Sequence, residues 1–322
     1  MAAPSRPTAA QAEIPIPQDD VIRNVSLLAR IYGSPLAHRL LPASLALALA
    51  SRLGPALRQR RNPSEQRDAL IFMRELLAHT SRADEATELA SRWLAEKSRM
   101  GELFWRPWLI RGSSVQGLEH LQAARAGGRG VVMVFGHILA AWSVPAILGT
   151  VGIPAYVVVG AHYYEPMPDG YEGIALMHRR VAYGESVLPM DHLVLATGRP
   201  ERLKELVEAG EIVTIAYDAP GRAATPFLGR TVGFGGAAPR LALETGAKIV
   251  PAIPERHGTR LVMRFYPAID PAEYEDTKSV RAAIARAFEP IVVARADEIE
   301  LAWIPCPLIT ELPPKETPGA SS

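Results

Sequence analysis

The first third of the chain repeats apolar residues at helical spacing. In NPSEQRDALIFMRELLAHT, Ser64 can cap a helix, Glu65 stands in its first turn, and apolar residues follow at Leu70, Ile71, Met73, Leu76 and Leu77. The stretch DEATELASRWLAEKSR places Ala86, Leu89, Ala90, Trp93 and Leu94 on one helical face. This pattern predicts a helical N-terminal region over residues 21–126.

From Gly127 the pattern changes to short apolar runs that alternate with helical segments. The runs GRGVVMVF, IPAYVVVG, EIVTIAYD, AKIVPAIPE and RLVMRFYPAI are typical of strands, several of them apolar enough to be buried on both faces. The helical segments RPERLKELVEAG and AAPRLALETG both end at a glycine, and SVRAAIARAFEPIVVARADEI is a late helix that contains Pro290. Such alternation predicts an α/β domain over residues 127–310, with a mainly parallel sheet covered by helices.

Composition narrows the class of protein. With 322 residues, 48% of them hydrophobic and 21% charged, the chain has the profile of a globular protein with a sizeable core. A net charge of +1 gives no basic footprint for nucleic acid. The single cysteine, Cys306, excludes an internal disulfide and a zinc site of several cysteines, and it fits a reducing compartment. We therefore expect a cytoplasmic protein without nucleic-acid partners.

The two ends of the chain differ from its interior. Residues 1–20 are polar and rich in proline, lack the basic and apolar regions of a secretory signal, and are expected to form a disordered tail. A second disordered tail is expected over residues 311–322.

The stretch LLPASLALALASRLGPALRQRR is apolar at first, is interrupted by Pro42 and Pro55, and closes on Arg58, Arg60 and Arg61. It falls short of the roughly 20 unbroken apolar residues of a membrane span. Two interpretations fit: a buried helix followed by a solvated basic turn, or an interfacial helix whose arginines meet anionic head groups. The second predicts peripheral contact with the inner face of the cytoplasmic membrane.

His137 stands where one strand ends. It follows the run GVVMVF by two residues, and sites in parallel sheets gather beyond the carboxyl ends of the strands. The segment after it, ILAAWSVPAILGTVG, is expected to be a helix and contains no carboxylate. Asp218 ends the strand EIVTIAYD and is expected at the same sheet edge, so it is the candidate partner of His137. The plainer interpretation makes His137 an ordinary loop histidine and Asp218 a turn former.

Three blocks of the chain, in this order, resemble one enzyme family. VQGLEHLQAARAGGRGVVMVFGH resembles the entry to the acyltransferase domain of the bacterial lipid A lauroyl/myristoyl acyltransferases, within the lysophospholipid acyltransferase-like superfamily. DAPGRAATPFLGRTVGFGGAAPRLALETGAKIVPAIPER resembles the second block of that family, and ELAWIP resembles its closing tryptophan segment. The resemblance covers about Ser64 to Pro305 and implies a glycerolipid acyltransferase-like fold.

The resemblance also implies residue roles. The family motif is a histidine, four further residues and then a carboxylate, which makes His137 the general base. The acid position is occupied by Trp142 or, if one residue is inserted, by Ser143, so the motif acid is missing. Asp218 stands at the aspartate of the second block. After the late Trp303 the family has a histidine and basic residues, whereas this chain has IPCPLI, which weakens the case for an anionic lipid acceptor.

These residues together predict an acyltransferase that uses acyl-CoA or acyl-carrier protein as donor and a lipid or small molecule as acceptor, without a cofactor. Asp218 or a bound substrate group would orient His137. Two alternatives stay open: a divergent enzyme for thioester hydrolysis, cyclisation or amine acylation, and a non-catalytic protein that binds acyl chains or carrier protein.

Candidate substrate-binding residues follow from the same blocks. Arg222 and Arg230 flank the PFLG loop and could hold a phosphate of the donor, although they could equally be ordinary surface arginines. The other candidates are Trp142, Ser143 and Gly221. No metal is expected, because His162, His178 and His192 lack ligand-type spacing with carboxylates.

Overall fold

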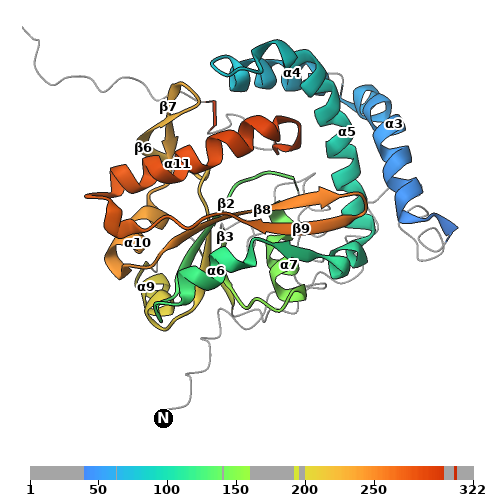
Figure 1. Ribbon diagram of the computed structural model, residues 1–322. Helices are drawn as coiled ribbons and strands as arrows, with labels where there is room; N and C mark the ends of the chain where they lie inside the picture. The colour runs from blue at the N-terminus through green and yellow to red at the C-terminus, as the bar shows by residue number, and fades with distance from the viewer. Residues whose placement is uncertain are drawn as a thin grey trace, which may run out of the picture.

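The computed structural model describes residues 40–62, 64–139, 141–159, 192–195, 200–300 and 308–309. Within these residues one sheet contains seven strands, drawn at the centre of Figure 1. Their spatial order is β1 (Ser114–Gln116), β9 (Arg260–Phe265), β8 (Ile249–His257), β2 (Val131–Phe135), β5 (Ile212–Ala216), β3 (Tyr156–Val159) and β4 (Leu193–Leu195).

Most neighbouring strands of this sheet are parallel, and only β8 and β9 pair antiparallel. All five residues of β2 are buried, as the unbroken apolar run VVMVF predicts for a strand covered on both faces. The α/β fold class with a mainly parallel sheet is therefore confirmed. A separate antiparallel hairpin, β6 (Pro220–Phe227) and β7 (Arg230–Phe234), occupies the stretch read from sequence as a loop.

Helices cover both faces of the sheet. Figure 1 shows α11 (Thr277–Ala294) over one face, and α6 (Leu118–Arg125) and α7 (Val144–Thr150) beneath the other. The helix α10 (Ala237–Thr245) contacts both α11 and α9 (Pro200–Glu208). A capping box starts α11, in which Asp276 accepts from the amide of Ser279, and Pro290 lies inside the helix without ending it.

The N-terminal helices α3 (Ala43–Arg61), α4 (Ser64–Leu77) and α5 (Ala86–Trp105) lie at one end of the sheet (Figure 1). Trp93 of α5 and Met73 of α4 are fully buried and belong to the same hydrophobic cluster as the strands. The strand β1 and helix α6 precede residue 127, so the sheet takes its first strand from the region that the sequence pattern assigns to helices.

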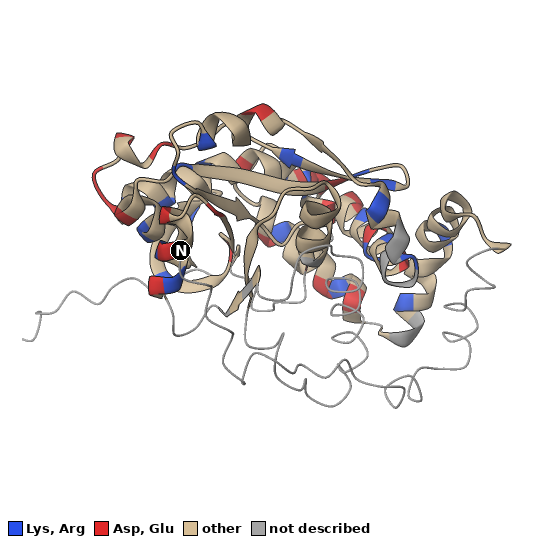
Figure 2. Cartoon of the chain, turned by 90° about the horizontal axis from the view of Figure 1, so that it is seen from below, with Lys and Arg blue, Asp and Glu red and all other residues tan. Residues whose placement is uncertain are grey.

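The helix α3 divides its apolar residues between two environments. Ala46 and Leu47 are buried, and α3 packs against α5. On the outer side, large apolar side chains repeat every four residues and are 38–56% exposed, at Leu45, Leu49, Leu53 and Leu57. Figure 2 shows acidic and basic residues mixed over the described elements, but every charged residue of α3 is an arginine. No helix in the described part of the chain combines the length and apolarity needed to cross a bilayer.

Short 3₁₀ turns connect several of these elements. They are η3 (Ala83–Glu85), η4 (Pro107–Gly112), η5 (Ala141–Ser143), η8 (Pro271–Glu273) and η9 (Ala296–Glu298). Two of them, η5 and η9, border the loop that carries His137.

Candidate active site

The register of two central strands brings His137 and Asp218 together. β2 and β5 are parallel neighbours, paired from Val131 opposite Ile212 to Phe135 opposite Ala216. Tyr217 then continues the ladder, because its amide donates to the carbonyl of Phe135 at 2.9 Å. Two residues beyond each strand end stand His137 and Asp218, so the sheet itself places them opposite each other.

Asp218 holds His137 by two hydrogen bonds. One carboxylate oxygen, Oδ2, accepts from the backbone amide of His137 at 2.7 Å, and the other, Oδ1, lies 2.7 Å from the ring atom Nδ1. The Asp218 side chain is 4% exposed, whereas that of His137 is 20% exposed. A carboxylate bound at Nδ1 fixes the ring orientation and selects the tautomer that leaves Nε2 free of a proton when the ring is neutral.

An aromatic cluster supports Asp218 from behind. The ring of Tyr217 stacks on Phe288 with centroids 3.9 Å apart, and it meets Phe234 edge-on at 5.4 Å. Gly136 leaves room for this ring, since a Cβ there would lie 2.6 Å from Cε1 of Tyr217. A residue larger than glycine at 136 would therefore push on the residue next to Asp218.

A second segment holds the loop that follows His137. Ile138 forms an antiparallel bridge with Ile299, the amide of Leu139 donates to the carbonyl of Glu298 at 2.6 Å, and the amide of Glu300 donates to the carbonyl of His137 at 3.0 Å. The segment after His137 is thus not the continuous helix expected from its sequence. Leu139 has a left-handed backbone conformation with φ of 53°, which no residue of a right-handed α-helix adopts. The helix α7 begins only at Val144.

Glu300 brings a second carboxyl group to this loop, and sequence reasoning missed it. Its Oε1 accepts from the amide of Ala141 at 3.2 Å, which is next to residues 142 and 143, where the resemblance places the motif acid. The residue was noted only as the first letter of the ELAWIP resemblance. Its membership of the ELAWIP block was the only signal in the sequence. That signal is weak, because nothing in the linear sequence relates residue 300 to residue 141.

The pKa values of the His137 imidazole and of the Glu300 carboxyl group are both strongly shifted. Burial by itself would lower the pKa of His137, but the charge and hydrogen bond of Asp218, with the charge of Glu300, raise it to about 9. Burial raises the pKa of Glu300 to about 7, against the opposing effect of the His137 charge and the Ala141 amide. A strongly shifted histidine and carboxyl at one sheet edge are typical of a functional site.

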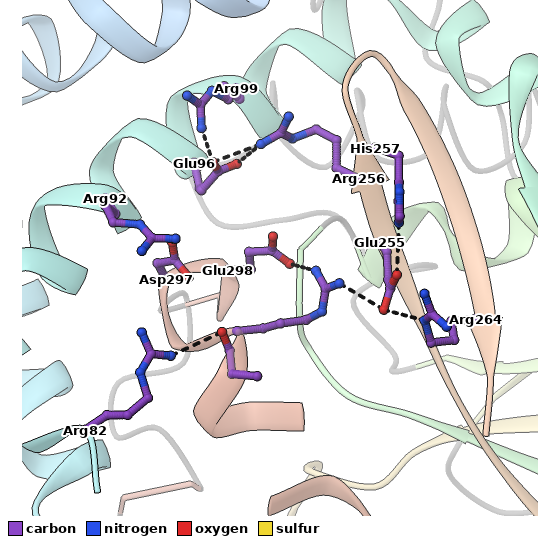
Figure 3. A network of polar contacts seen from close by, with 12 residues as sticks. Arg82, Arg92, Glu96, Arg99, Glu255, Arg256, His257, Arg264, Asp297 and Glu298 are labelled. Carbon is purple, nitrogen blue, oxygen red and sulfur yellow. Dashed lines mark hydrogen bonds and ion pairs between the residues drawn. The ribbon is translucent and has the colours of Figure 1, made fainter. Parts of the chain in front are cut away.

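A network of ion pairs anchors the segment that carries Glu300 (Figure 3). Arg92 of α5 binds Asp297 at 2.8 Å, and Arg295 binds both Glu298 at 2.7 Å and Glu255 of β8 at 2.9 Å. The buried Glu255 also accepts from Arg264 at 2.8 Å. Further members of this network include Arg82, Glu96, Arg99, Arg256 and His257.

Trp93 adds a neutral hydrogen bond to the same segment. Its indole Nε1 donates to the carbonyl of Ile299 at 2.6 Å. The backbone just before Glu300 is therefore fixed from α5 as well as from β8.

The remaining predicted residues are not all near His137. Ser143 is fully buried at the N-terminal end of α7, and the side chain of Trp142 lies outside the described residues. Gly221 lies at an irregularity of the β6–β7 hairpin, where a Cβ would come within 2.2 Å of the carbonyl oxygen of Phe234. This close backbone approach explains the glycine without a substrate contact.

The two candidate arginines differ. Arg222 is exposed on β6. Arg230 is largely buried, binds Glu75 of α4 at 2.8 Å, and so ties the hairpin to the N-terminal helices. That ion pair gives Arg230 a structural role, and its expected contact with a phosphate stays a prediction. His192 stacks on Tyr156, and no group of three potential metal ligands occurs in the described part of the chain.

Comparison with known proteins places the chain in a family. The profile of a family described as bacterial lipid A biosynthesis acyltransferase matches residues 36–299, which is more than half of the chain. The chain belongs to this family. Membership supports acyl transfer in general, and the β2–His137 junction and the strand that ends at Asp218 both lie inside the matched region.

Among solved structures, the chain is similar to the 1-acyl-sn-glycerophosphate (LPA) acyltransferase PlsC from Thermotoga maritima. The match has 16% sequence identity and a TM-score of 0.37, and it covers 71% of this chain and 97% of that chain. No curated protein matches the chain at the level of sequence.

Proposed function

We propose that the protein transfers a fatty acyl group from a thioester of coenzyme A or acyl-carrier protein to a hydroxyl group of a lipid or small-molecule acceptor. The observation that carries the proposal is the two-point contact between Asp218 and His137, at a strand end of an acyltransferase-family domain. A histidine oriented in this way is suited to general-base catalysis.

The proposed reaction uses His137 twice. With Nδ1–H held by Asp218, the unprotonated Nε2 takes the proton of the acceptor hydroxyl while its oxygen attacks the thioester carbonyl. The tetrahedral intermediate then collapses, its C–S bond breaks, and His137 returns the proton to the leaving thiolate. Asp218 remains ionised and stabilises the imidazolium between the two steps.

The first test is turnover of long-chain acyl thioesters by purified protein, with and without hydroxyl acceptors. We expect His137→Ala to abolish turnover. Because it also leaves the buried carboxylate of Asp218 without its imidazole partner, the variant should unfold at a lower temperature, and turnover is measured where circular dichroism shows it to be folded. The matched control is His120→Ala on α6, which should retain full turnover.

The outcomes separate the alternatives. Equal turnover in wild type and His137→Ala contradicts His137 catalysis and favours a protein that binds acyl chains or carrier protein. Loss of thioester without acylated acceptor, abolished by His137→Ala, would replace acyl transfer to a hydroxyl by hydrolysis or cyclisation. Product formed only with amine acceptors would assign amine acylation.

Arg222 is the donor-binding residue that we propose, because it is an exposed arginine on the hairpin that follows Asp218. A guanidinium can bind a phosphate of coenzyme A or phosphopantetheine through two parallel hydrogen bonds. Arg222→Gln should raise the KM for the donor without changing the unfolding temperature. An unchanged KM would remove Arg222 from the site.

We also propose peripheral membrane contact through α3. Four exposed leucines on one helical face, together with arginines as its only charged residues, match an interfacial helix on an anionic surface. Of the arginines, Arg58 pairs with Glu65 at 3.1 Å, whereas Arg52 is exposed beside the leucine stripe.

The test is flotation with vesicles of anionic lipid at low and high salt. Wild type should bind at low salt and dissociate at high salt, and Leu49→Gln with Leu53→Gln should remove binding without lowering stability. The matched control, Leu47→Gln on the buried face, should instead lower stability. A wild type that stays unbound at low salt contradicts the proposal.

A further inference from the structure

Glu300 contacts both ends of the loop that carries His137. Its backbone amide donates to the carbonyl of His137, and its side-chain oxygen accepts from the amide of Ala141. The three residues between these two points include the strained Leu139, which lacks the support of a regular helix. Glu300 therefore ties both ends of this loop, while Glu298 and Ile299 hold its middle.

Above its pKa of about 7, the same carboxyl group is a second negative charge acting on the imidazole, besides Asp218. Its charge contributes to the high pKa of His137, and that of His137 acts in return on Glu300. The other charged groups that act on Glu300 are Asp218, at the end of β5, and Lys97, on α5, which itself pairs with Glu65 at 2.9 Å. Glu300 lies just beyond the region matched to the family, so the match assigns it no role.

We infer that Glu300 is a positioning residue of the His137 site, which compensates for the carboxylate absent at residues 142 and 143. It holds the His137–Ala141 loop in its non-helical course and places a second negative charge opposite the imidazolium that forms during proton transfer. Asp218 orients the imidazole ring, whereas Glu300 fixes the conformation of the loop and adds a negative charge near the ring. The catalytic consequence of this inference rests on the proposed function. The contact between Glu300 and His137 does not depend on that function.

The variant that isolates the charge is Glu300→Gln. A glutamine can still accept from the Ala141 amide, so the loop keeps its hydrogen bond while the charge disappears. The pKa of the His137 ring is then read by NMR on protein labelled in histidine. We expect Glu300→Gln to lower this pKa by about one pH unit, as removal of a nearby opposite charge does. The rate kcat should fall and KM should stay the same.

A second variant isolates the hydrogen bond. Glu300→Ala removes both charge and acceptor, so it should reduce kcat more than Glu300→Gln and also speed hydrogen exchange at the Ala141 amide. The matched control is Glu289→Gln, which makes the same change at another glutamate that accepts from a backbone amide, that of Leu228 at 2.7 Å. This control should leave the His137 pKa and kcat unchanged.

The results distinguish this inference from the proposed function. An unchanged His137 pKa in Glu300→Gln overturns the inference, whether or not the wild type transfers acyl groups. A lowered pKa in a wild type that turns over no thioester supports the contact and contradicts the proposed function. A lowered pKa with kcat equal to wild type at every pH overturns the positioning role.

Discussion

Two segments hold the His137 loop, and they do so by different means. The segment at Tyr217 and Asp218 continues a central strand and rests on stacked aromatic rings. The segment from Asp297 to Glu300 follows the end of α11 and rests on ion pairs to α5 and β8. The packing that holds the first segment in place is apolar and depends little on pH and salt, whereas the contacts that hold the second segment depend on charge. We call the segment at Tyr217 and Asp218 the rigid support and the segment from Asp297 to Glu300 the charged support. Salt and pH are expected to weaken only the contacts that hold the charged support in place.

Asp218→Asn should have the largest effect on kcat, because it changes the side chain of the rigid support that contacts the His137 ring. An asparagine whose oxygen accepts from the His137 amide turns its NH₂ group toward Nδ1, so the ring must carry its proton on Nε2 and can no longer act as a base. We expect kcat to fall by about 10³- to 10⁴-fold with little change in KM, as for analogous triads. Steady-state kinetics check this, and a decrease of less than about tenfold would contradict the assigned tautomer.

Gly136→Ala should disturb the same support without removing a polar group. The new Cβ meets the ring of Tyr217 at 2.6 Å, so Tyr217 and the adjacent Asp218 must shift. Displacement of catalytic groups on the order of 1 Å costs roughly 10²-fold in rate. The control is Gly127→Ala, where nothing lies within 4 Å of the added atom, and which should keep wild-type kcat. Equal effects of the two substitutions would contradict the role of Tyr217.

The pH dependence tests both supports together. The base is the neutral ring, and the pKa of His137 is raised to about 9, so kcat/KM should rise about tenfold per pH unit until that value. Because the folded state binds this proton more tightly than the unfolded state, the stabilisation is complete below the ordinary value of 6.5 and is lost as the pH rises toward 9.

Rate profiles and denaturant unfolding between pH 6 and 10 check these two signs. His137→Gln should remove the loss of stability over that window, since glutamine does not titrate. Unfolding free energy that increases from pH 6.5 to 9 in the wild type, but not in this variant, would contradict the raised pKa.

Arg295→Met should have the smallest effect on rate. Arg295 affects the His137 site only through its ion pairs in the charged support. It leaves the buried Glu255 with fewer partners and frees Glu298, so we expect a loss of about 1–3 kcal/mol in unfolding free energy and a few-fold decrease in kcat. The control is Arg202→Met, whose ion pair with Glu205 is exposed and worth less than about 1 kcal/mol. Chemical denaturation decides the comparison, and equal losses would show that the buried pairs have no special weight.

The rigid support was the predictable one. The apolar runs that became β2 and β5, and the position of His137 and Asp218 just beyond them, follow from linear patterns, so their proximity was expected and is confirmed by the two hydrogen bonds. The course of the chain after His137 was predicted wrongly as a helix, because apolar spacing cannot show that Ile138 bridges to Ile299. Glu300 was missed for the same reason, since its contact spans 159 residues.

The N-terminal and hairpin regions show other limits of pattern reading. The structure of α3 fits either interpretation, because one face packs on α5 while the leucine stripe stays exposed, and membrane contact stays a prediction. The contact of Arg230 with a phosphate stays a prediction, and its ion-pair partner Glu75 comes from a helix 155 residues earlier, which no local pattern reveals. Gly221 looked like a binding-loop glycine, and only the neighbouring strand explains it.

The order in which the site's parts occur along the chain has a consequence for synthesis on the ribosome. His137 emerges from the ribosome first and Asp218 later. Residues 298–300, which contact the His137 loop, emerge only after nearly the whole sheet. Domains fold as the chain emerges from N- to C-terminus. A nascent chain that has formed β2 and β5 still lacks the ion pairs and backbone contacts that hold Ile138, Leu139 and Ala141, so the arrangement around His137 is incomplete until the segment after α11 has docked. Completion of the fold and completion of the site therefore coincide.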